Sequence, residues 1–220
     1  AAETEASTIV TAHYFDAATT SVKTRQVDYA KANAPLVLDD PDGDGTGEAF
    51  CHACGATKNW VRVTETLQTQ RAENGMSLHY YVDEDITTTA KNMDTNGEET
   101  DTSTEGSFFW AWPKGGSICV HIAEGKTLDI SSYIHNSGGT LNMMGKGTLI
   151  GGTNAFAERG KAICNFGWNA VTNLFGNTYK AKTDVNVLSL ASGGTYGNKN
   201  NVMNIFADAV VEGKFYQKLG

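Results

Sequence analysis

Residues 142–145 read Asn142-Met143-Met144-Gly145, and the same pattern returns as Asn173-Leu174-Phe175-Gly176 and Asn204-Ile205-Phe206-Ala207. The three copies lie 31 residues apart, twice in succession, and each is followed by a second short β-prone run. One coil of short strands cannot bury its inner face alone, so such coils stack and their buried positions recur at a fixed period. The repeat therefore predicts an all-β fold whose C-terminal half is a β-solenoid.

An asparagine opens each copy of the repeat, at residues 142, 173 and 204. In a stack of coils, Asn142, Asn173 and Asn204 would lie above one another where the chain turns, and their side-chain amides could form a ladder. The alternative is that these side chains bind a ligand. The equal spacing favours the structural ladder.

The chain divides into three segments of different character. Residues 1–50 form an N-terminal arm without sustained periodicity, and they contain a β-prone stretch from Ser7 to Phe15 and an acidic loop. Residues 51–107 hold a cysteine knuckle, short strands and an acidic insertion. Residues 108–220 are expected to form the solenoid coils, and the alternation in 117–122 places three apolar side chains on one face.

Several motifs in a fixed order resemble secreted bacterial cell-surface proteins with right-handed parallel β-helix repeats of the pectate-lyase type. The motifs are Cys51-His52-Ala53-Cys54-Gly55, His79-Tyr80-Tyr81-Val82, Ile118-Cys119-Val120-His121-Ile122 and the run from Gly139 to Ile150. The resemblance covers residues 48–216 and leaves the N-terminal arm unmatched. It implies a right-handed parallel β-solenoid on the cell surface, and no particular chemistry, because a fold does not fix a function.

Charge and hydropathy argue against nucleic-acid binding and against a membrane span. The net charge of −8 argues against nucleic-acid binding, which needs a surplus of Lys and Arg. No apolar run approaches the ~18 residues of a membrane span. The start, Ala1-Ala2-Glu3, looks like the product of signal-peptide cleavage and favours secretion, although a trimmed chain would begin in the same way.

An acidic loop in the arm is a candidate calcium site. Asp40, Asp42 and Asp44 alternate before Gly45, as in an EF-hand loop, where alternation lets several oxygens converge on one cation. The glutamate expected at the twelfth loop position is replaced by Cys51, so Glu48 could help only in a different geometry. The alternative is a hydrated acidic turn.

The Cys51-x-x-Cys54 pair is half of a zinc knuckle, and three interpretations stay open. In an oxidising compartment a local disulfide is the most economical. Zinc is less favoured because tetrahedral coordination needs four ligands and no second pair appears, although His52 or His79 could serve. The third alternative is free thiols.

Aromatic residues concentrate at the start of the predicted solenoid coils. Phe109, Trp110 and Trp112 could form a platform on which sugar rings stack. The alternative is that they cap the first coil. The carboxylates of residues 111–220 are scattered, so catalysis is not expected; the rival to a structural role is a carbohydrate-binding module or a polysaccharide lyase or hydrolase.

The leading hypothesis is a non-catalytic protein of the cell surface with a structural or adhesive role, which could act as a self-assembling subunit of a filament or surface layer. Up to residue 110 there are 19 acidic against 7 basic residues, a net of −12, and from residue 111 there are 6 against 10, a net of +4. These opposite charges would favour head-to-tail contact between copies. We expect the segment from Ser7 to Phe15 to act as a donor strand that covers the last coil of a neighbouring copy.

Overall fold

The structure is a computed structural model that describes residues 7–39, 46–88, 107–112, 115–152, 160–167, 169–182, 186–191 and 201–218. Strands make up most of the described chain, which confirms the predicted all-β class. The described helix, α1 (Tyr29–Asn33), has five residues. Within the described ranges no helix has the length and apolar character that crossing a bilayer requires.

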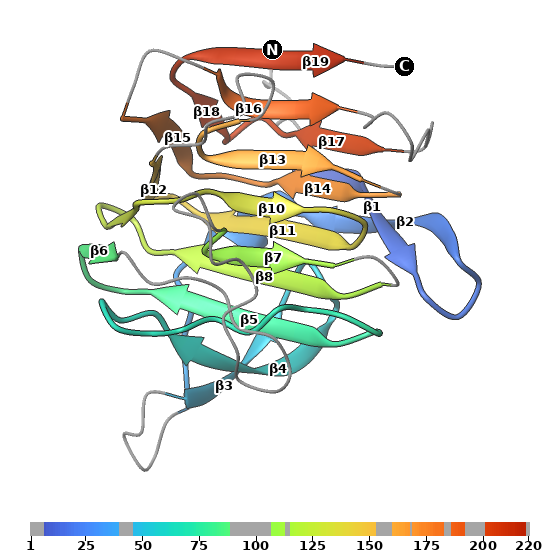
Figure 1. Cartoon of the computed structure of the whole chain (residues 1–220). Coiled ribbons are helices and arrows are strands. Elements are labelled where there is room, and N and C mark those ends of the chain that lie inside the picture. Colours follow the sequence, from blue (N-terminus) through green and yellow to red (C-terminus); the bar gives the residue numbers. More distant parts are fainter. Residues whose placement is uncertain are drawn as a thin grey trace, which may run out of the picture.

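Most strands belong to three sheets that are almost entirely parallel (Figure 1). Sheet I consists of β3 (Thr46–Cys51), β4 (Ala56–Arg62), β5 (Ser77–Val82), β8 (Ser117–Ile122), β11 (Thr140–Gly145), β14 (Val171–Leu174) and β17 (Val202–Ile205). Sheet II consists of β6 (Ile86–Thr88), β9 (Thr127–Ile130), β12 (Thr148–Gly151), β15 (Thr178–Ala181) and β18 (Val210–Val211). Sheet III consists of β7 (Phe109–Ala111), β10 (Ile134–Asn136), β13 (Ile163–Phe166), β16 (Asn186–Ala191) and β19 (Lys214–Lys218).

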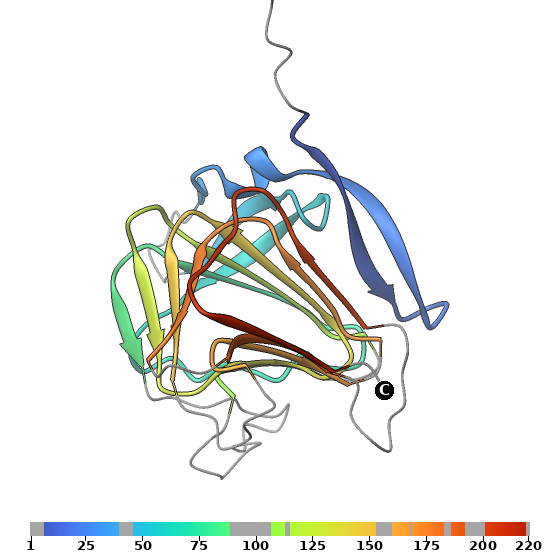
Figure 2. The ribbon, with the colours of Figure 1, turned by 90° about the horizontal axis from the view of Figure 1, so that it is seen from above.

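From β5 onward the chain visits sheets I, II and III in that order, and it does so five times in the described strands. We call each circuit a rung, so that β5–β7 form the first rung and β17–β19 the last. Each strand pairs in parallel with the strand above it in the next rung. Seen from above, in Figure 2, the strands of each sheet overlie one another around a shared interior.

Side chains alternate across each strand, and this decides which residues enter the interior. Ile118, Val120 and Ile122, predicted to share one face, are fully buried in a core that also receives Leu128 from sheet II and Ile134 from sheet III. Burial of each such side chain contributes roughly 1.5–3 kcal/mol. Because neighbouring rungs are in register, apolar residues stack on apolar residues through the interior.

The opposite, outer face of sheet I is covered by the N-terminal part of the chain. β1 (Ile9–Asp16) and β2 (Ser21–Asp28) form an antiparallel hairpin, and α1 follows with Asp28 as its N-cap. We call this unit, residues 9–33, the N-terminal cap; in Figure 2 it is the blue element outside the stacked sheets. A second apolar cluster joins Ala12 and Val27 of the cap to side chains on the outer face of sheet I.

One predicted strand and the predicted start of the coils can be compared with the structure. The β-prone segment from Ser7 to Phe15 does form a strand, β1, but it pairs with β2 of the same chain. The parallel stack starts before residue 108, because β5 and β6 of the 51–107 segment already pair with β8 and β9. The acidic insertion separates these strands from the later ones in the sequence and hides their common repeat.

Candidate metal centre

Three cysteines and one histidine converge beside the first rungs of sheet I. Cys51 ends β3, Cys54 lies in the turn after it, His79 is on β5 and Cys119 is on β8. Their ligand atoms, three sulfurs and one imidazole nitrogen, all lie within 4.8 Å of one another. Cys54 Sγ lies 3.3 Å from Cys119 Sγ and 3.4 Å from His79 Nε2. We call these four residues the Cys3His cluster.

A tight turn between β3 and β4 brings the first two sulfurs to the cluster. The backbone N–H groups of Cys54 and Gly55 both donate to the carbonyl oxygen of Cys51, at 3.2 and 2.7 Å. Gly55 has a φ of +75°, in the left-handed region that glycine adopts without steric cost. The Cys-x-x-Cys-Gly sequence is therefore the local determinant of this half of the cluster.

Strand register supplies the other half. His79 and Cys119 both point outward from sheet I and are direct partners in the parallel pairing of β5 with β8. Both are buried, as is Cys51, while Cys54 is partly exposed. The Trp60 ring packs edge-on against the His79 ring with centroids 4.9 Å apart. Among the described residues none hydrogen-bonds to His79 Nδ1, so packing against Trp60 orients the imidazole.

The thiols of the cluster differ in their pKa values. The pKa of the Cys54 thiol is lowered because the Cys119 and Cys51 thiols donate hydrogen bonds to it and His79 lies beside it. The pKa of Cys119 is raised well above its usual value, because it interacts with the Cys51 and Cys54 sulfurs and is completely buried. Cys54 is therefore the first sulfur to become a thiolate, the form that binds metal ions.

Two neighbours connect the cluster to the rest of the molecule. Asn142 Nδ2 lies 3.4 Å from Cys119 Sγ and donates to it. The guanidinium of Arg25, on β2, donates to the carbonyl oxygens of Ala53 and Cys54. Arg25 therefore fixes the cysteine turn to the N-terminal cap, and Asn142 joins the cluster to the third rung.

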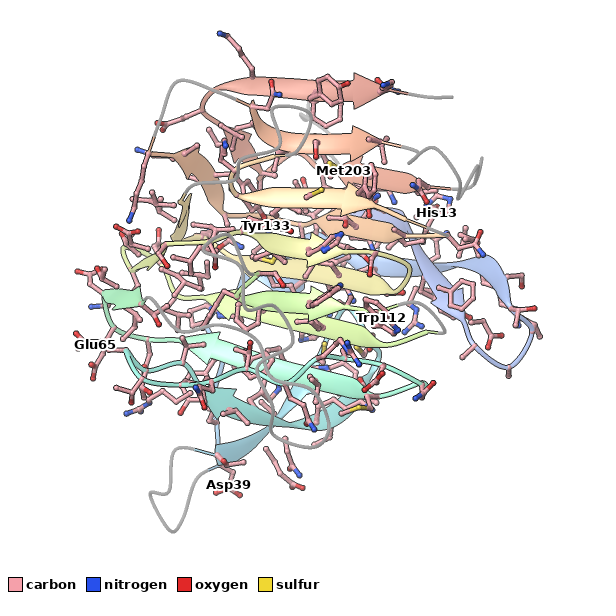
Figure 3. All side chains as sticks on the ribbon, viewed as in Figure 1. His13, Asp39, Glu65, Trp112, Tyr133 and Met203 are labelled. Carbon is pink, nitrogen blue, oxygen red and sulfur yellow. The ribbon has the colours of Figure 1, made fainter. Side chains whose placement is uncertain are left out.

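The three repeat asparagines form a hydrogen-bonded ladder. They are direct partners in β11, β14 and β17; Asn173 Nδ2 donates to Asn142 Oδ1 and Asn204 Nδ2 donates to Asn173 Oδ1, each at 2.9 Å. His13, labelled in Figure 3, adds a carbonyl oxygen that accepts from Asn173 Nδ2 at 2.8 Å. The amides bond to one another and to the cap, as a structural role requires. We call Asn142, Asn173 and Asn204 the amide ladder.

The sequence locates only part of the Cys3His cluster. Cys51 and Cys54 come together, but none of the four cysteines, all of them in the described ranges, forms a disulfide. His52 packs against Phe50 outside the cluster, whereas His79 is a member. Cys119 is a member that sequence reasoning missed. The sequence feature that could have indicated Cys119 is the alternation that surrounds both His79 and Cys119. It is hard to recognise because these two residues are 40 apart, whereas the repeat asparagines are 31 apart.

Most of the predicted calcium loop lies outside the described residues, since Asp40, Asp42 and Asp44 fall in the range 40–45. Glu48 is described and exposed on β3. Its backbone exchanges two hydrogen bonds of 3.1 Å with Asp39. The calcium site stays a prediction.

The predicted aromatic platform is partly wrong. Phe109 is fully buried in the core and cannot offer its ring to a sugar. Trp110 and Trp112 are half-buried and pack edge-on with centroids 4.8 Å apart; Trp112 is labelled in Figure 3. The Arg71 guanidinium lies 4.5 Å from the centre of the Trp112 ring and occupies a face that a sugar would use.

Comparisons with known proteins add no relative. No protein-family model matches the chain, no curated protein matches it, and no solved structure matches its fold. Function is therefore inferred from the geometry of this chain.

Proposed function

We propose that the chain is a non-catalytic structural protein of the cell surface, built as a right-handed parallel β-solenoid that associates with copies of itself. The fixed order of sheets I, II and III and the in-register pairing between rungs support the solenoid. The right hand follows from the strong preference of parallel crossover connections for that hand. The cell-surface location is the one implied by the resemblance of the ordered motifs.

Self-association is supported by one observation, the state of the last rung. No described strand pairs with the outward edges of β17, β18 and β19. Ile205, Val210 and Phe215 on these strands are 46%, 49% and 42% exposed, whereas Leu174, the partner of Ile205 one rung below, is fully buried. Unpaired edges with exposed apolar side chains are a template for another strand.

At the other end of the stack, the edge of sheet I is already paired. β4 extends sheet I, β3 pairs antiparallel with β4, and Asp39 pairs with Glu48 on the far edge of β3. In sheets II and III no described strand lies beyond β6 and β7, although Ala72 forms a bridge with Ala111 of β7. The two ends of the stack are therefore different surfaces. Contact between unlike surfaces of two copies is heterologous and builds rings or filaments, in agreement with the proposed head-to-tail arrangement.

The donor-strand part of this proposal has a specific form. Because β1 pairs with β2 along its whole length, exchange between copies would move the hairpin as one unit. The contacts of His13 with Asn173 and Asn204 would then form between two chains. The −12 charge up to residue 110 and the +4 charge beyond it would favour that contact.

Sedimentation velocity over a range of concentrations tests the proposal. We expect the wild-type chain to form particles of two or more copies, and the double variant Val210→Lys, Phe215→Glu to remain monomeric. Val37→Lys is the matched control, because Val37 is an apolar side chain with 83% exposure outside the last rung. A wild-type chain that stays monomeric at every concentration, or equal association of all three proteins, would contradict it.

A further inference from the structure

We propose that the Cys3His cluster binds one Zn²⁺ ion in a closed, tetrahedral, structural site. This inference is independent of the proposed self-association, which concerns the opposite end of the stack. Three sulfurs and one imidazole nitrogen are a donor set of structural zinc sites, which take four protein ligands and leave no position for a substrate.

The distances fit a tetrahedron around zinc. With zinc–sulfur bonds of about 2.3 Å, two sulfurs of such a site lie about 3.8 Å apart. Cys54 Sγ is 3.3 Å from Cys119 Sγ and 3.4 Å from His79 Nε2, and no pair of ligand atoms in the cluster exceeds 4.8 Å. Changes of up to about 1 Å in these distances would therefore accommodate the ion.

The burial of the cluster calls for a cation. Cys51, His79 and Cys119 are nearly inaccessible to solvent, and the Trp60 ring closes one side. Thiol groups are weak hydrogen-bond donors, so three thiols around one imidazole, two of them buried, satisfy one another poorly. A divalent cation would replace the thiol protons and give each sulfur a strong partner.

The surroundings fit the net negative charge that three thiolates and one Zn²⁺ would carry. Asn142 donates its N–H to Cys119 Sγ, and the N–H of Gly55 closes the turn that holds Cys51 and Cys54. The guanidinium of Arg25 sits on the carbonyl oxygens of the same turn. Groups outside the ligand set commonly orient metal ligands in this way.

The site would join three parts of the chain that are distant in sequence. Cys51 and Cys54 come from the turn between β3 and β4, while His79 and Cys119 come from the first and second rungs. β3 pairs with neither β5 nor β8, because in the β3–β4 hairpin only β4 pairs with β5. Zinc would therefore clamp the β3–β4 end of sheet I onto the parallel stack.

A disulfide is the competing use of the same sulfurs. A bond between Cys51 and Cys54, or between Cys54 and Cys119, needs the two sulfurs to approach to about 2.05 Å. Either bond would use two of the three sulfurs and leave the third cysteine and His79 outside it. The test must therefore measure metal content and thiol state together.

The experiment is metal analysis of the full chain, purified with zinc in the medium and no chelator, combined with intact mass and thiol titration. We expect about one Zn²⁺ per chain and all four cysteines reduced. Cys119→Ser should lower the zinc content to near zero. The matched controls are Cys164→Ser, a buried cysteine on β13, and His52→Ala, a histidine beside the cysteines that points elsewhere; both should keep the metal.

Co²⁺ binding to the wild-type chain is a second test, which does not depend on whether Cys119→Ser folds. Co²⁺ added to the zinc-depleted, reduced wild-type chain should give the intense visible absorption of tetrahedral cobalt with a sulfur-to-cobalt charge-transfer band, and Zn²⁺ should displace it. Absence of zinc and of these bands from the reduced chain would overturn the proposal. So would a mass 2 Da below that of the reduced chain with a disulfide mapped to the cluster, or equal loss of zinc in Cys119→Ser and Cys164→Ser.

Discussion

One column of side chains on the outer face of sheet I changes its chemistry half-way along. In the first two rungs the column holds His79 and Cys119, and in the next three it holds the amide ladder. A ladder of amides works only where each neighbour repeats the same backbone at the same spacing. At the β3–β4 end, β4 pairs in parallel with β5, but its register brings Trp60 and not an amide to the position beside His79.

The difference shows how a repetitive stack can be closed at one end. Each amide bond adds about 1 kcal/mol net, and the same bond is available at every rung. A structural zinc ion supplies about 10–16 kcal/mol of binding free energy at a single point and accepts ligands from unlike elements. Asn142 connects the amide ladder to the Cys3His cluster, because its Oδ1 accepts from Asn173 and its Nδ2 donates to Cys119.

Removal of zinc should have the largest effect on this column. If the free metal is at about 1,000 times its dissociation constant, the ion stabilises the fold by about 4 kcal/mol. For a chain of this size that loss would lower the melting temperature by roughly 8–16 °C. Thermal unfolding followed by circular dichroism, with and without a zinc chelator, measures it.

The control for chelation is the Cys119→Ser variant, whose melting temperature should not respond to the chelator. An equal shift in wild type and variant would mean that the chelator acts elsewhere, for example at the predicted calcium loop. Restoring zinc and calcium separately to the wild-type chain distinguishes these two sites.

Asn142→Ala should weaken zinc binding 10- to 100-fold, because loss of the N–H donor leaves the Cys119 sulfur without its hydrogen bond. That factor corresponds to about 1.4–2.7 kcal/mol. Competition with a chromophoric chelator gives the affinity, and a shifted sulfur-to-cobalt band in the Co²⁺ form would show that the sulfur itself is perturbed. Asn204→Ala, two rungs away and bonded to Asn173 and His13, is the control and should bind zinc as the wild type does.

Local patterns predict the strands and the ladder well. The 31-residue spacing alone aligns Asn142, Asn173 and Asn204, because consecutive rungs of similar length keep their register. The alternation in 117–122 separates inward from outward residues, since side chains on a strand point to opposite faces in turn. These features depend on neighbours in one strand or on equal rung lengths.

The cluster needs information that sequence spacing does not carry. Cys119 lies 40 residues after its partner His79 and 23 before Asn142, because the loops between rungs differ in length. Where the number of residues between successive strands varies, the packing of the interior sets the register between the strands, and no constant sequence period predicts it. The cysteine turn is recognisable from its own residues, whereas the rest of the cluster requires the fold.

Asn173→Ala should destabilise the chain by about 2 kcal/mol, within the range for leaving buried partners of a hydrogen bond unsatisfied. Asn173 has the most partners of the ladder, since it bonds to Asn142, Asn204 and the backbone of His13. Urea unfolding measures the loss. Asn173→Asp keeps the size but removes the N–H donors, so it should be at least as destabilising; a stable Asp variant would show that the amide N–H groups contribute nothing.

Asn204→Ala should have the smallest effect, about 0.5–1 kcal/mol. Asn204 ends the ladder on the last rung, where it donates to Asn173 Oδ1 and lies 2.9 Å from His13 Nδ1, and it is only partly buried. Water can replace part of what the alanine removes, because solvent reaches this rung and not the interior ones. Urea unfolding of Asn204→Ala beside Asn173→Ala should therefore show a clear difference in the free energy of unfolding.

The comparison also depends on self-association. If a second copy covers the last rung, the destabilisation caused by Asn204→Ala should rise with protein concentration, while that caused by Asn173→Ala should not. Equal costs for both variants in dilute, monomeric protein would mean that the ladder does not weaken toward its exposed end.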